Sequence, residues 1–103
     1  MLKSQLLHPD VLRSLAQAGH SSQILIADGN YPFNIGAPAH ADRVYLNFAP
    51  GLINATDTLR ILMTAIPIES AAVMLQSDGE EAPIIADFRG LLTDVPMTVY
   101  ERF

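Results

Sequence analysis

Two residues in the N-terminal third of the sequence have side chains suited to proton transfer. His20 follows Gly19, and Asp28 comes eight positions later. A histidine side chain can both donate and accept a proton near neutral pH, and a carboxylate can orient a hydroxyl group of a ligand. The pair therefore suits acid and base catalysis in which one group moves protons and the other holds the reactant.

Each of the two residues also has a structural interpretation. His20 lies where a helix is expected to end, so its imidazole could bond the last helical carbonyl groups. Asp28 precedes Gly29, and its side chain could accept hydrogen bonds from the backbone amides that follow. The residue types alone leave both alternatives open.

The elements expected in the first half of the chain place these residues at the ends of regular structure. The apolar spacing after Pro9 predicts a helix over about Asp10 to Ala18. The run Ile24–Ala27 has no polar alternation, which predicts a strand covered on both faces, with Asp28 at its carboxyl end. The Pro-containing and Gly-containing stretch 30–42 is expected to be a long, functional loop.

Helices and apolar strands alternate through the second half of the chain. This alternation indicates an α/β architecture with a mostly parallel or mixed sheet. The expected elements are a short strand at Val44–Leu46, a helix at 56–65, a strand at Ala71–Leu75, a polar turn at 77–83, a helix at 84–92 and a strand at 97–100.

Composition narrows the class of protein. The chain has 103 residues, which predicts one domain, and it carries a formal net charge of −5 with only six Lys plus Arg, which argues against a nucleic-acid ligand. No apolar run approaches the roughly 18 to 20 residues that span a membrane, and no secretory signal is seen. The absence of cysteine fits a cytoplasmic protein. Half of the residues are hydrophobic, so part of the surface is expected to meet another subunit.

A resemblance to a known family rests on the segment 19–32, which reads GHSSQILIADGNYP. It resembles the N-terminal signature of the ribose pyranase and fucose mutarotase (RbsD/FucU) family. There a Gly-His pair is followed by a short polar turn, an apolar strand, an Asp and a loop with Pro. The resemblance implies that His20 is the catalytic proton donor and that Asp28 binds a sugar.

A second, looser match runs from Arg43 through Gly51 to Met74. Tyr45 stands where many relatives have an acidic residue, and a phenol does not replace a carboxylate as an anionic acceptor. Arg102 resembles an Arg or His that relatives place beside the sugar, the alternative being a solvated charge near the chain end. The family continues into a Tyr-x-Asn motif that has no counterpart here, so we expect one RbsD/FucU-like domain over 1–103 that is short at its C-terminal end.

The resemblance implies a three-layer α/β/α fold with a mostly parallel or mixed central sheet. It also implies a sugar mutarotase or pyranase acting on a monosaccharide of the L-fucose or D-ribose type, without a cofactor. His8 and His40 have no ligand-spaced partners, so a metal site is not expected. The alternatives are a catalytically silent monosaccharide-binding or regulatory homologue, and an α/β oligomerisation domain.

The distance between His20 and Asp28 bears on the assembly. An extended segment of about five residues spans roughly 16 Å. Unless the Ser21–Ser22 turn folds His20 back, a site that uses both side chains must combine neighbouring subunits. This agrees with the homo-oligomer and the interface site that the resemblance implies, and we expect an assembly larger than a dimer.

Overall fold

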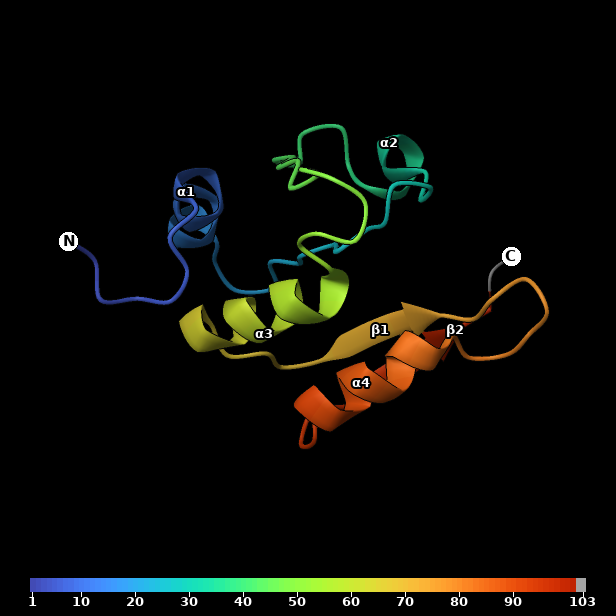
Figure 1. The fold of residues 1–103 in the computed structure, drawn as a ribbon. Coiled ribbons are helices and arrows are strands. Elements are labelled where there is room, and N and C mark those ends of the chain that lie inside the picture. Colours follow the sequence, from blue (N-terminus) through green and yellow to red (C-terminus); the bar gives the residue numbers. More distant parts are fainter. Residues whose placement is uncertain (102–103) are drawn as a thin grey trace.

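The computed structural model describes residues 1–101, apart from the side chain of Phe33, and its helices alternate with strands only in the second half of the chain (Figure 1). The elements are α1 (Pro9–Gln17), α2 (Phe33–Gly36), α3 (Ala55–Ala65), β1 (Ala71–Met74), α4 (Pro83–Leu91) and β2 (Met97–Tyr100).

The second half of the molecule is built on a β1–α4–β2 unit. The two strands are parallel, and their register runs from Ala71 opposite Met97 to Met74 opposite Tyr100. Parallel strands cannot be joined by a tight turn, and α4 supplies the crossover between them. The α/β class predicted from the sequence is therefore confirmed. Within the described residues the sheet has these two strands.

Local sequence signals explain where the helices begin. Proline occupies the first turn of α1 and of α4, where its missing N–H costs nothing. Asn54 caps α3, because its side-chain oxygen accepts a hydrogen bond from the Asp57 amide at 2.8 Å. The three helices predicted at these positions are confirmed with ends within one residue, as are the strands at 71–74 and 97–100.

Two expected strands are absent from the described structure. Ile24–Ala27 and Val44–Leu46 have no regular secondary structure and no ladder partner. Ile24 and Leu25 are each 48% exposed, so the expectation of a strand covered on both faces was wrong. Apolar runs of this length predict burial from hydrophobicity alone, but a strand also needs a neighbour for its backbone groups.

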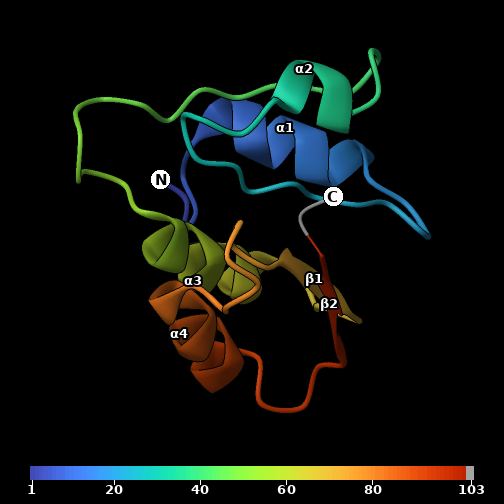
Figure 2. The same cartoon turned by 90° about the vertical axis from the view of Figure 1, so that its right-hand side faces the viewer.

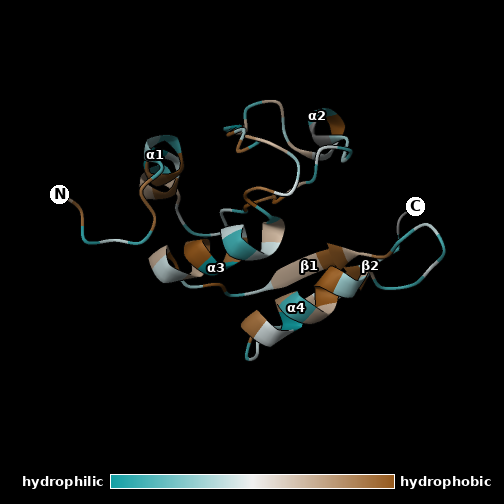
Figure 3. Cartoon of the chain, viewed as in Figure 1, coloured by the Kyte–Doolittle hydropathy of each residue, from teal (hydrophilic) through white to brown (hydrophobic). Residues whose placement is uncertain are grey.

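The helices divide between two sides of the molecule. The helices α1 and α2 lie on one side, separated from each other in Figure 1, and α3, α4 and the strand pair lie on the other (Figures 1 and 2). Hydrophobic residues gather on α3, α4 and β1 (Figure 3), and α3 packs against α4. The apolar residues that are buried among the described residues, each only 3–7% exposed, come from the N-terminal segment, α3, α4 and the turn after α4: Leu6, Leu62, Ile85 and Leu92.

Much apolar surface remains outside this small core. The chain exposes 8143 Å², whereas a self-contained folded chain of 11.2 kDa exposes about 5,700 Å². The difference is about 2,400 Å². The described fold therefore leaves a large area that its own elements do not cover.

Candidate functional site

His20 lies in a tight turn directly after α1. The turn is closed twice, because the Ser22 amide donates to the Gly19 carbonyl at 3.1 Å and the Gly19 amide donates to Ser22 Oγ at 2.9 Å. Ser21, the third residue of the turn, has φ +67°, a left-handed conformation that few residues other than glycine adopt. The turn thus holds the backbone on both sides of His20.

The imidazole of His20 is exposed and makes no hydrogen bond within the described structure. The end of α1 is closed instead by the Ala18 amide, which donates to the Leu15 carbonyl at 3.1 Å. The structure therefore does not support the alternative in which His20 caps this helix. A ring without an intramolecular partner is free to exchange protons with a ligand.

Asp28 directs one carboxylate oxygen to the backbone and leaves the other available. Its Oδ1 accepts hydrogen bonds from the amides of Asn30 and Tyr31, both at 2.9 Å. The turn role considered for this residue is confirmed. Its Oδ2 has no hydrogen-bond partner among residues 1–101, and the residue is exposed. A carboxylate oriented in this way can accept a hydroxyl group without giving up its turn.

Asp42 ties the loop after Asp28 to the helix before His20. Ser14 on α1 donates its hydroxyl to Asp42 Oδ2 at 2.8 Å, and Arg13 Nη1 lies 3.6 Å from the same oxygen. The charged side chains are about half exposed, so the ion pair contributes little to stability on its own. Together with the Ser14 hydrogen bond, it holds the loop 30–42 against α1.

Arg43 stabilises the end of the same loop. Its guanidinium donates to the carbonyls of Pro38, Ala39 and Ala41 at 3.3–3.4 Å, while the Ala41 amide donates to the Pro38 carbonyl at 3.0 Å. Several long hydrogen bonds to one cation fix the turn more firmly than a single bond. Arg43 is the residue at which the second, looser sequence match begins.

Gly36 allows Tyr31 to pack across the loop. A Cβ atom added at Gly36 would lie 2.6 Å from Tyr31 Oη and 2.7 Å from its Cε1. Only a residue without a side chain fits there without moving the ring. Tyr31 is partly buried, so the loop has packing of its own.

The predicted site residues are not joined to one another in the described chain. No hydrogen bond or ion pair there links His20 with Asp28, and Arg102 lies outside the described residues. Tyr45, which replaces an acidic residue of the relatives, is 65% exposed. Tyr45 lines a surface hollow.

That hollow is a feature that the sequence did not predict. It is open to solvent, has a volume of about 230 Å³, and is lined by His8, Tyr45, Leu46, Asn47, Phe48 and Ile53. His8 lies more than thirty positions before the other members, which all fall within the segment 45–53. No periodic pattern connects His8 with the segment 45–53.

Other residues that position the candidate site were also missed. Ser22 and Asp42 act through hydrogen bonds to Gly19 and Ser14. A Ser three residues after a Gly is a usable turn signal. The Asp42 contact spans 28 residues, and the sequence holds no signal for it.

No group of three or more His, Asp or Glu side chains within residues 1–101 is arranged to hold a metal ion. In the same residues, no helix has the length and apolar character needed to cross a bilayer.

The fold and the two turns define a small α/β protein with an exposed histidine and an oriented carboxylate. A family model described as the RbsD / FucU transport protein family matches residues 1–103. The chain belongs to this family.

Curated relatives that match the chain are named D-ribose pyranase. The protein of Paracidovorax citrulli is 29% identical over 104 residues, covering 100% of this chain and 77% of the relative. That of Vibrio campbellii is 33% identical over 73 residues, covering 71% and 50%, and that of Variovorax paradoxus is 26% identical over 101 residues, covering 96% and 74%. No solved structure matches significantly.

Proposed function

We propose that this protein interconverts the ring forms of a monosaccharide of the D-ribose or L-fucose type by acid and base catalysis. The family match over the whole sequence and the relatives named D-ribose pyranase support the general class. The particular sugar and the roles of individual residues are part of the proposal.

The chemistry needs one proton donor and one proton acceptor. The ring oxygen is protonated while the anomeric hydroxyl loses its proton, so the bond between the anomeric carbon and the ring oxygen breaks and an aldehyde forms. A hydroxyl group of the open chain then attacks the aldehyde, and the proton transfers run in reverse. Atoms and charges balance without a metal or a nucleotide.

In this proposal the imidazole of His20 both gives a proton to the ring oxygen and takes the proton of the anomeric hydroxyl, while Asp28 holds a sugar hydroxyl and Arg102 contributes a further hydrogen bond. The observation that carries it is the exposed imidazole of His20, which makes no hydrogen bond to the described part of the chain and lies on a turn that two hydrogen bonds close. The free Oδ2 of Asp28 supports the binding role. Proton transfer by a positioned histidine contributes typically 10²- to 10⁴-fold to a rate.

A second candidate function is a catalytically silent homologue that binds a monosaccharide or regulates another protein. The observation that favours it is that no hydrogen bond or ion pair joins His20 and Asp28 in the described chain. A binder needs only the carboxylate and a surface, whereas catalysis needs both side chains on one sugar.

We further propose that the site is completed in a homo-oligomer larger than a dimer, located in the cytoplasm. The excess exposed area of about 2,400 Å² supports the assembly, because a standard interface removes only about 800 Å² from each partner. The single domain over 1–103 and the three-layer arrangement of the family also belong to this proposal.

Saturation-transfer NMR on D-ribose and L-fucose tests the function. The protein is expected to accelerate exchange between isomers, and His20→Gln is expected to abolish the acceleration while its circular dichroism spectrum stays unchanged. His40→Gln, at an exposed histidine outside the turn, is the matched control and should retain full activity. Binding without accelerated exchange would favour the silent homologue, and full activity of His20→Gln would remove this residue from the mechanism.

A further inference from the structure

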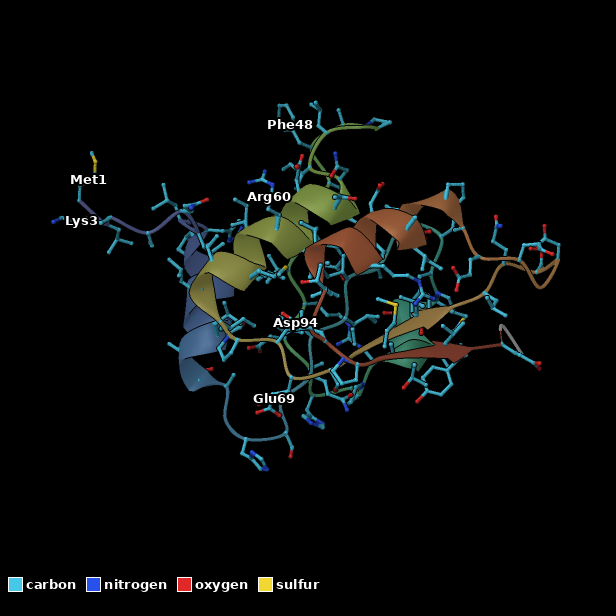
Figure 4. The ribbon with its side chains drawn as sticks, turned by 90° about the horizontal axis from the view of Figure 1, so that it is seen from below. Met1, Lys3, Phe48, Arg60, Glu69 and Asp94 are labelled. Atoms are coloured by element: carbon cyan, nitrogen blue, oxygen red, sulfur yellow. The ribbon has the colours of Figure 1, made fainter. Side chains whose placement is uncertain are left out.

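One exposed apolar surface includes neither His20 nor Asp28. We call it the Phe48 face, and it consists of Tyr45, Phe48, Leu52 and Ile53 with the adjacent His8. The four apolar or aromatic residues are 65%, 81%, 52% and 54% exposed. Phe48 lies at the outer rim of the molecule, on the loop that precedes α3 (Figure 4). Clustered exposure of this kind marks an interaction surface rather than scattered apolar residues.

The backbone of the Phe48 face is ordered by its own hydrogen bonds. The Leu52 amide donates to the Ala49 carbonyl at 3.1 Å, with Pro50 and Gly51 at the centre of the turn and Gly51 at φ +81°. Pro followed by Gly suits this turn type. The Phe48 amide donates to the Leu46 carbonyl at 3.1 Å. The face is therefore preformed, which lowers the entropic cost of binding.

Ile53 shows that this order includes backbone strain. Its φ is +55°, and a β-branched residue rarely adopts the left-handed region. The next residue, Asn54, caps α3, so the loop is held between its turn and the helix. Strain of this kind persists where the surroundings fix a functional conformation.

The charge distribution selects a second copy of this chain as the partner. The segment 44–56 contains no charged residue, and it is bounded by Arg43 and Asp57. Each copy carries a net charge of −5, so two copies repel each other except where a surface lacks acidic groups. A basic partner would instead favour an acidic surface.

The excess exposed area of the chain also favours a second copy as the partner. The chain exposes about 2,400 Å² more than a self-contained protein of its mass. Contacts with copies of itself remove such an excess from every chain at once. Aromatic residues such as Phe48 and Tyr45 are enriched at the energetic centres of protein interfaces.

We propose that the Phe48 face is a contact between copies of this chain. The inference rests on the assembly proposed above and names the surface through which it forms. His8 takes part, because its Nδ1 is buried beside the hollow and has no hydrogen-bond partner in the described structure. A polar group from the neighbouring copy satisfies this atom when the hollow is covered.

Light scattering coupled to size-exclusion chromatography tests the face. Phe48→Glu adds a charge at a side chain that is 81% exposed, so folding is preserved while the contact is lost. The mass is expected to fall below that of the wild type. The matched control is Ile35→Glu on α2, which adds the same charge at a side chain that is 88% exposed. It is expected to keep the wild-type mass.

Thiol labelling gives a second measurement, because the chain has no cysteine of its own. Asn47→Cys places a thiol on the rim of the hollow, and Asn34→Cys places one on the exposed surface of α2. In the assembled protein, maleimide is expected to react several-fold more slowly at position 47 than at position 34. Adding Phe48→Glu should equalise the two rates.

The outcomes separate this inference from the proposed activity. A monomeric wild type, an unchanged mass of Phe48→Glu, or an equal loss of mass in Ile35→Glu would overturn the Phe48 face. Assembly through this face without accelerated sugar exchange would overturn the proposed activity and leave the face in place. Accelerated sugar exchange by a monomeric protein would overturn the Phe48 face and leave the proposed activity in place.

Discussion

Asp28 shows how one carboxylate can hold its own turn and still be available to a ligand. Both backbone amides bond the same oxygen, Oδ1, at 2.9 Å. The turn interpretation and the binding interpretation were alternatives at the level of sequence. The structure makes them compatible, because each uses a different oxygen atom.

Replacement of Asp28 by Asn separates these two roles. Asn keeps an oxygen that accepts from the Asn30 and Tyr31 amides but has no charge, so the unfolding free energy should change by less than about 0.5 kcal/mol. Sugar affinity is expected to fall by about tenfold or more, since a hydrogen bond to a charged group contributes about 1.5–3 kcal/mol. Ligand-detected NMR titration and urea unfolding measure the two effects.

Asp28→Ala is the comparison variant. It removes the turn acceptor as well and should cost about 1 kcal/mol of stability. Equal sugar affinity in wild type and Asp28→Asn would show that the carboxylate does not bind the ligand.

Ser22 is expected to position His20 through its bond to the Gly19 amide. Ser22→Ala removes the acceptor Oγ, at a cost of about 0.5 kcal/mol because the bond is exposed. The exchange rate at saturating sugar should fall several-fold with little change in sugar affinity, since the ring moves while Asp28 stays in place. Saturation-transfer NMR at a series of sugar concentrations separates these two quantities.

Two further variants control for general effects at Ser22. Ser22→Thr keeps the hydroxyl group and should restore the rate. Ser77→Ala removes an exposed serine that makes no hydrogen bond in the described structure, and should leave the rate unchanged. A failure of Thr to restore activity would count against positioning by the hydroxyl.

At the scale of elements, α3 depends on its cap. Asn54→Ala removes the acceptor for the Asp57 amide and is expected to destabilise the protein by about 1 kcal/mol. Asn54→Asp keeps the acceptor and should stay within about 0.5 kcal/mol of the wild type. Urea unfolding followed by circular dichroism measures both; equal stability of the Ala and Asp variants would contradict a capping role.

The elements that sequence reasoning found are those with local signals. Pro9 and Pro83 mark the starts of α1 and α4, and the two strands of the sheet flank α4 in the chain. The strand predicted at Ile24–Ala27 is absent because strand pairing depends on a neighbouring strand that hydrophobicity does not specify. His20 and Asp28 are predicted as site residues from residue type and resemblance, whereas the hydrogen bond between Ser14 and Asp42, 28 residues apart, depends on tertiary contacts alone.

At the scale of the whole molecule, charge and apolar contact act in opposite directions. Copies with a net charge of −5 repel, while the Phe48 face carries no acidic group. Raising NaCl from about 0.05 M to about 0.5 M screens the repulsion and leaves the apolar contact intact, so assembly should stay equal or become tighter. Sedimentation velocity at both salt concentrations measures this; dissociation at high salt would indicate ion pairs at the contact.

The small set of buried side chains has a consequence for measurements in dilute solution. Burial of one aliphatic side chain contributes about 1.5–3 kcal/mol, and the buried apolar residues among the described ones are Leu6, Leu62, Ile85 and Leu92. When neighbouring copies supply the remaining burial, folding and association become one equilibrium. The melting temperature then rises with protein concentration, and its value has meaning only when that concentration is given.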